Sequence, residues 1–171
     1  DLIKDAKYDE AAVKLDEVAK IATEYENAEV AEKAKELVPQ MWMQKGVDAL
    51  KLKDFATAAD GFAKSYAADT TAGKTALYLG QALGAQGKTE EAIEAFRHAA
   101  WNGEEAEAKE QVSNIYVRQA NAALKGQKFA DAVKAADKAN SYSENATAYL
   151  IAGQSSQKLS KNADAIKYFE K

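Results

Sequence analysis

The stretch from Gly73 to Ala106 constrains the fold more than any other part of this chain. It contains two short amphipathic segments on either side of the turn Gln86-Gly87-Lys88. Small residues stand where two antiparallel helices would cross, and large apolar residues flank them. The small residues are Gly80, Ala92 and Ala99, and the large ones are Leu79, Leu83 and Phe96. The pattern predicts a helix-turn-helix unit.

The turn and the start of the following segment recur along the chain. Each copy places an alanine just after acidic or small polar residues. These alanines are Ala11, Ala58, Ala92, Ala132 and Ala165. Two longer units also resemble each other, because residues 35–43 align with 109–117 and the match continues through Phe55 and Phe129, which lie 74 residues apart. We therefore predict a single repeat domain over 1–171, made of a half repeat (1–27) and paired repeats at 28–106 and 107–171.

The spacing and residue types of residues 73–106 resemble the tetratricopeptide repeat, a helix-turn-helix unit of about 34 residues. The resemblance extends over essentially the whole chain and is weakest over residues 1–38. It implies an all-α, right-handed superhelical solenoid of antiparallel helix pairs, with about 4.5 repeats. The nine predicted helices are 4–25, 28–52, 55–67, 73–86, 89–101, 104–125, 129–140, 146–158 and 162–171.

Composition supports the all-α prediction, because Ala, Lys, Glu and Gln are frequent and favour helices. Pro39 falls inside the second predicted helix, which should kink or split there because proline lacks an N–H. Ile166, Tyr168 and Phe169 near the end should need another helix against them, so we expect the chain to be a piece of a longer array or to pair through its ends.

Catalytic and metal-binding chemistry is not indicated. The chain has no cysteine and one histidine, His98, which follows Arg97 and suits a surface position better than a catalytic one. Gly73-Lys74-Thr75 imitates the end of a phosphate-binding loop, but that motif needs a glycine where Ala68 stands. Glutamates such as Glu90 and Glu91 lie near predicted helix starts, where they complement the helix dipole. We predict no enzyme activity, no metal and no cofactor.

Charge and hydropathy limit the classes of partner. The net charge of −4 and the pI of about 5.2 argue against a nucleic-acid-binding face. No apolar run approaches the roughly 18 residues of a membrane span, so we expect no membrane insertion. The repetitive Ala/Lys/Gln-rich units look bacterial, and the start at Asp1 slightly favours an exported, periplasmic protein over a cytoplasmic one.

The family resemblance also implies where a partner would bind. In tetratricopeptide-repeat proteins the first helix of each pair lines a concave groove that binds a peptide or a helix of a partner protein. Amides there could bond a peptide backbone, and bases could meet carboxylates. The residues predicted to face this groove are Gln40, Met43, Gln44, Val47, Lys74, Tyr78, Gln81, Asn114, Arg118, Asn121, Lys125, Gln154, Gln157 and Lys158.

The sequence therefore predicts a non-catalytic scaffold for protein–protein interaction. Self-assembly through the chain ends as a homo-oligomer stays open as an alternative. A second alternative is an accessory domain of a larger enzyme or secretion complex. Binding of a small ligand between repeats is weaker, because Tyr78 is the one aromatic residue in the predicted groove.

Overall fold

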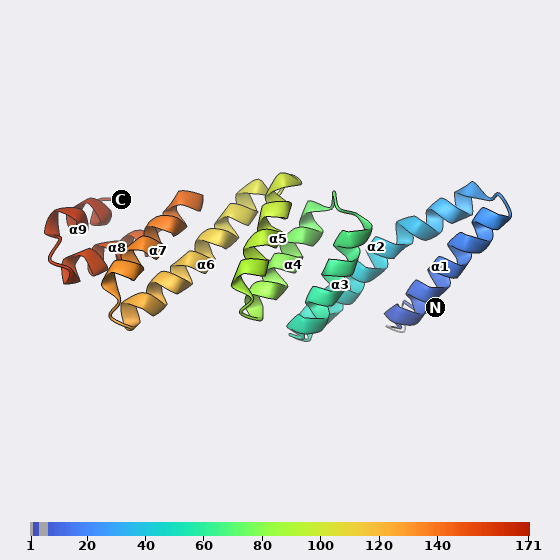
Figure 1. Cartoon of the computed structure of the whole chain (residues 1–171), viewed down its shortest axis with the longest axis horizontal. Coiled ribbons are helices and arrows are strands. Elements are labelled where there is room, and N and C mark those ends of the chain that lie inside the picture. The colour runs from blue at the N-terminus through green and yellow to red at the C-terminus, as the bar shows by residue number, and fades with distance from the viewer. Residues whose placement is uncertain (1, 4–6) are drawn as a thin grey trace. The chain divides into compact units, whose positions relative to one another are not determined.

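The computed structural model describes residues 2–3 and 7–171, and in these residues the regular elements are helices joined by short turns, without a strand (Figure 1). The all-α prediction is confirmed, and so are the nine helices it expected in the described part. They are α1 (Tyr8–Glu24), α2 (Ala28–Lys51), α3 (Phe55–Ala68), α4 (Gly73–Ala85), α5 (Thr89–Trp101), α6 (Glu105–Lys125), α7 (Phe129–Tyr142), α8 (Ala146–Lys158) and α9 (Asn162–Phe169).

Two details of the first pair differ from expectation. Helix α1 begins at Tyr8 rather than at residue 4: Lys7 is not helical, with φ −90° and ψ 60°, and residues 4–6 lie outside the described part. Helix α2 is not split at Pro39 but continues to Lys51. The Pro39 carbonyl accepts a hydrogen bond from Ser65 Oγ at 2.8 Å, and Trp42 in the next turn packs with α1, so tertiary contacts offset the missing backbone bond.

The helices form two compact units, Asp1–Glu104 with α1 to α5 and Glu105–Lys171 with α6 to α9. Within each unit every helix packs against the helix before and after it in the sequence, and α6 also contacts α8. We call the two units the N-terminal unit and the C-terminal unit. The arrangement of the whole chain as one repeat domain, with the repeat boundaries given above, stays a prediction.

Each helix pair is closed by a small residue on its first helix and an aromatic or small residue sixteen positions later. A Cβ placed on Gly46 of α2 would lie 2.5 Å from the Phe62 ring of α3. Gly80 and Phe96 repeat this relation between α4 and α5, with 2.7 Å to the ring. Gly153 likewise lies under the ring of Phe169. These glycines allow the two helix backbones to approach closely.

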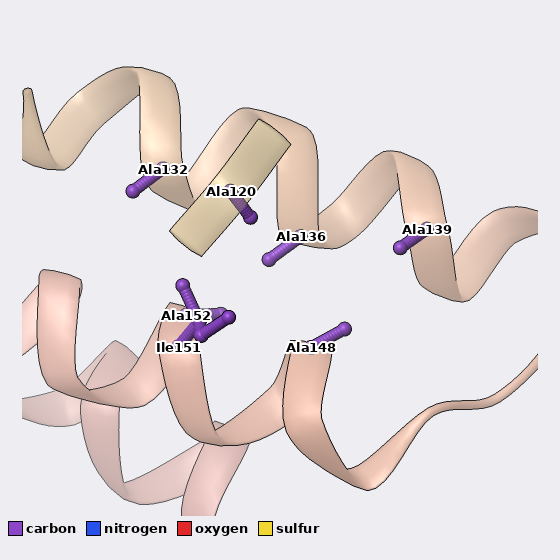
Figure 2. Packing of buried hydrophobic residues seen from close by; sticks show 7 residues of the cluster. All are labelled: Ala120, Ala132, Ala136, Ala139, Ala148, Ile151 and Ala152. Carbon is purple, nitrogen blue, oxygen red and sulfur yellow. The ribbon is translucent and has the colours of Figure 1, made fainter. Parts of the chain in front are cut away.

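The α6–α7 pair uses two alanines in the same register. Ala120 and Ala136 are both fully buried, and their methyl groups point into the same space between the helices (Figure 2). They belong to a core of small side chains shared by α6, α7 and α8. Its buried members are Ala120, Ala132, Ala136, Ala139, Ala148, Ile151 and Ala152. The core of the C-terminal unit thus rests on close backbone approach rather than on large side chains.

The turns inside the pairs share one backbone feature. Seven positions after the small residue of each first helix (Gly46, Gly80, Ala120 or Gly153), the backbone has a positive φ. The φ values are 59° at Lys53, 79° at Gly87, 57° at Gln127 and 60° at Ser160. A side chain with a Cβ is disfavoured in this left-handed region. Three of the four turns therefore carry a backbone conformation that glycine would adopt more easily.

A cation–π contact recurs at the 74-residue offset. Lys64 Nζ lies 4.4 Å from the centroid of the Trp42 ring, and Lys138 Nζ lies 4.9 Å from that of Tyr116. In both cases a lysine of the second helix covers an aromatic ring of the first. The similarity between the two longer units therefore extends to this side-chain contact.

The three residues expected to need a further helix beyond α9 behave differently from one another. Tyr168 instead faces α7, where its hydroxyl donates to Asp137 Oδ1 at 2.8 Å. Phe169 covers Gly153 but stays 50% exposed, and Ile166 is 57% exposed. The expectation was thus wrong for Tyr168, because its hydroxyl has an acceptor within the unit.

Candidate functional site

The predicted groove residues of the N-terminal unit lie on α2 and α4, and each of them is exposed or half-buried. Three are engaged within the chain. The Tyr78 ring stacks on Phe62 with centroids 5.6 Å apart, and Met43 Sδ accepts a weak bond from Thr75 Oγ1 at 3.8 Å. Gln44 Nε2 donates to Asp48 Oδ1 at 3.0 Å. These contacts limit the freedom of three of the predicted groove side chains on this unit.

Asp48 connects this face to α1. Its other oxygen accepts a 2.5 Å bond from the Tyr8 hydroxyl, and Lys51 lies 2.8 Å away. Bonds from Gln44, Lys51 and Tyr8 lower the pKa of Asp48 to about 2. Burial and the bond to Asp48 raise the pKa of Tyr8 to about 12. The ionised carboxylate of Asp48 thus links α1 to α2 through hydrogen bonds.

The other predicted groove residues lie on α6 and α8 of the C-terminal unit, two helices that contact each other. Asn114 Oδ1 accepts from Asn145 Nδ2 at 3.3 Å and is half-buried. The remaining six side chains are exposed, and we call them the basic face. They are Arg118, Asn121, Lys125, Gln154, Gln157 and Lys158.

Charge distinguishes the basic face from the rest of an acidic chain. Its three cations form no salt bridge with a described residue. No Asp or Glu occurs in α6 after Glu110 or anywhere in α8. Positions 114, 118, 121 and 125 follow the three- and four-residue spacing of one helix face. The arrangement can accept carboxylates at the bases and backbone amides at the Asn and Gln side chains.

The sequence analysis missed a hollow of about 520 Å³ in the N-terminal unit, which we call the acidic hollow. Its floor is formed by apolar residues of α4 and α5, and its walls include Tyr66 of α3. The lining residues are Tyr66, Ala76, Leu79, Leu83, Glu90, Glu91, Glu94, Ala95 and His98. The signal in the sequence is Leu79, which the pattern predicts to flank the helix crossing but which lies half-buried in this floor.

One side of the acidic hollow is held together by short contacts. The rings of Tyr66 and His98 lie 5.7 Å apart, and His98 Nε2 is 3.3 Å from Glu94 Oε1. Glu94 also pairs with Arg97. His98 is thus an exposed surface side chain, as the sequence indicated, and it forms part of the rim of the hollow.

Two further surfaces are less developed. On the C-terminal unit a hollow of about 320 Å³ lies beside Tyr116 and Lys138. On the N-terminal unit a smaller one, about 260 Å³, lies beside the exposed apolar residues Val18 and Ile21 of α1 and Tyr25, which follows α1. In the described residues no group of acidic, histidine or cysteine side chains is placed to hold a metal ion. None of the described helices is long and apolar enough to cross a membrane.

No protein-family model matches this chain, and no curated protein matches its sequence. Several solved structures are similar to its fold. A crystal structure of a MamA protein has a TM-score of 0.53 at 18% identity, covering 94% of this chain and 89% of that chain. A structure described as a MamA RS-1 ArsTM double mutant has a TM-score of 0.52 at 14% identity, covering 94% and 91%. These are tetratricopeptide-type helical solenoids, so the chain has a tetratricopeptide-type helical-repeat fold.

Proposed function

We propose that this protein is a non-catalytic scaffold for protein–protein interaction and that its basic face binds an extended acidic segment of a partner protein. The observation that carries the proposal is that three cations, which form no salt bridge within the described part of the chain, and three amides are exposed on α6 and α8. In a chain of net charge −4 this surface attracts carboxylates, while the rest of the molecule repels them.

The geometry suits a peptide rather than a small molecule. An extended peptide presents an N–H and a C=O at each residue, which Asn121, Gln154 and Gln157 can bond. Acidic side chains can then pair with the bases. None of the three hollows described above is lined by a residue of the basic face, and its side chains are bases and amides, which favours reversible binding as its role.

The test is a fluorescence-anisotropy titration of the full chain with a labelled peptide of alternating glutamate and valine. The triple variant R118Q/K125Q/K158Q should weaken binding at least about tenfold at low salt, because each charge-assisted bond is worth about 1.5–3 kcal/mol at best and less when exposed. A control variant, K128Q/K161Q/K167Q, removes the same charge from exposed positions elsewhere and should change the Kd less than about twofold. An equal loss of peptide affinity in both variants would contradict the proposal.

Self-assembly is the second candidate, and the exposed apolar residues of α1 and α9 favour it. Val18 and Ile21 on α1 are 43% and 55% exposed, Tyr25 just after α1 is 80% exposed, and Ile166 on α9 is 57% exposed. Light scattering over a concentration series would detect it. A dimer or larger species that I166K dissociates would support assembly through these helices, and a monomer at every concentration would reject it.

A further inference from the structure

The acidic hollow lies on a different side of α4 from the predicted groove. Helical geometry places Leu79 and Leu83 about half a turn around α4 from Lys74 and Gln81. Its walls come from second helices, α3 and α5, rather than from first helices. A ligand in the hollow would therefore not compete with a peptide on the predicted groove face of the N-terminal unit, which belongs to α2 and α4.

The hollow is preformed by bonds between α3 and the end of α5. Asn102 Nδ2 donates to the carbonyl of Thr70 at 3.1 Å and to the Tyr66 hydroxyl at 3.4 Å. The contact of Tyr66 with His98 adds a ring interaction between the same two helices. A site that exists before binding loses less conformational entropy when a ligand enters.

The floor of the hollow is apolar. Ala76 and Ala95 are buried, and Leu79 presents part of its side chain to the space. The volume of about 520 Å³ falls in the range of ligand-binding clefts. An aliphatic or aromatic side chain placed here would remove its own surface and that of Leu79 from water.

The rim determines the charge of the occupant. Glu90 and Glu91 form no salt bridge with a described residue, whereas Glu94 pairs with Arg97 and His98. Two carboxylates are therefore available beside an apolar floor. A cationic group that follows an apolar one in the ligand would meet them, whereas an anionic ligand would be repelled.

We propose that the acidic hollow is a second docking site, which binds a partner segment that carries a large apolar side chain flanked by lysine or arginine. The apolar side chain lies on Leu79, and the flanking cations pair with Glu90 and Glu91. The two sites of the molecule thus select segments of opposite charge.

The probe is a fluorescein-labelled peptide in which one leucine is flanked on each side by two lysines. Titration of the full chain at low salt should give saturable binding. E90Q/E91Q should weaken it about fivefold, because two partly exposed ion pairs are lost. The control E107Q/E110Q removes the same charge from exposed positions on α6 and should leave the Kd within about twofold. A matched peptide with glycine in place of leucine should bind at least about tenfold more weakly.

A second variant tests the floor. L79K fills the hollow and places an ammonium group beside the glutamates, so binding should be lost while the helical circular-dichroism signal stays. The proposal is overturned if the lysine–leucine peptide shows no saturable binding, if its glycine counterpart binds equally well, or if E107Q/E110Q weakens binding as much as E90Q/E91Q. Because the basic face lies on other helices, its triple variant should leave this peptide's Kd unchanged, which separates the two proposals.

Discussion

The Phe62 ring covers Gly46 so closely that a Cβ on Gly46 would lie 2.5 Å from ring atoms Cδ1 and Cε1. Because Phe62 itself is fully buried, its ring has little room to move away. The same relation holds for Gly80 with Phe96, so the helix pairs are closed by contact between a backbone and a ring.

Gly46→Ala should therefore destabilise the protein by about 1–3 kcal/mol, as overpacking of a core does. This exceeds the gain of up to about 1 kcal/mol that alanine brings inside a helix. The control is Gly84→Ala, where a Cβ would meet only the Ala92 methyl at 3.8 Å. That substitution should stabilise by about 0.5–1 kcal/mol. Urea unfolding followed by circular dichroism measures both, and a stabilised Gly46→Ala variant would refute the packing argument.

The Ala120–Ala136 contact should be convertible into the glycine–phenylalanine type. Ala136→Phe alone should be strongly destabilising, because the ring would meet the Ala120 methyl (Figure 2). The double variant A120G/A136F should regain much of that loss, with a coupling free energy of about 1–3 kcal/mol in its favour. The check is a double-mutant cycle of unfolding free energies. Simple additivity of the two changes would contradict the shared register.

Replacing Gln127 by glycine should stabilise the turn between α6 and α7. A φ of 57° costs a residue with a Cβ roughly 1–2 kcal/mol. Glycine relieves this strain, but it has more conformational freedom to lose on folding, which offsets part of the gain. We expect a net gain of about 0.5–1 kcal/mol. Gln119→Gly is the matched control, because Gln119 is an exposed position inside α6 and should lose about 1 kcal/mol. Thermal unfolding of the two variants should shift in opposite directions.

Acid should weaken the link between α1 and α2. The folded-state pKa of Asp48 is about 2, below the value of about 3.9 in an unfolded chain. The ionised carboxylate therefore stabilises the fold above about pH 4, and this contribution is lost as the pH falls from 4 to 2.

Asp48→Asn removes that dependence, so the stability difference between the parent protein and the variant should shrink as the pH falls through this window. Urea unfolding at pH 6, 4 and 2.5 tests it. Tyr8→Phe removes one of the three donors and should move the titration of Asp48 upward in an NMR titration of the carboxylate. A constant difference across the pH range would show that Asp48 does not titrate as the structure indicates.

The sequence was sufficient for the helices and their crossings because these depend on local periodicity. It also contained the correct start of α1, which the sequence analysis did not use. Helices α3 and α5 begin three residues before their crossing alanines, Ala58 and Ala92, and Tyr8 stands in the same place before Ala11. The register of the repeat was a better guide than the apolar residues near the beginning of the chain.

Features that depend on distant residues were not accessible in this way. The sequence pattern places Tyr168 with Ile166 and Phe169 as residues that need a further helix, because its acceptor, Asp137, lies 31 residues earlier and is not apparent from local spacing. The acidic hollow depends on the distance between α3 and α5, which Asn102 helps to set through bonds to residues more than thirty positions away. The predicted groove residues followed from helical spacing, and their exposure agrees with that spacing, whereas their role in binding stays a prediction.

The fixed separations inside each helix pair also bear on how such a chain can change in length. Unequal crossing-over between coding segments that match at the 74-residue offset would add or delete a whole pair of helix pairs. Each added helix pair would keep the sixteen-residue separation between its small residue and the residue that packs on it, because both lie in the same pair. A change in length by complete modules would thus keep these contacts, whereas an insertion of a few codons between Gly46 and Phe62, for example, would disrupt the core.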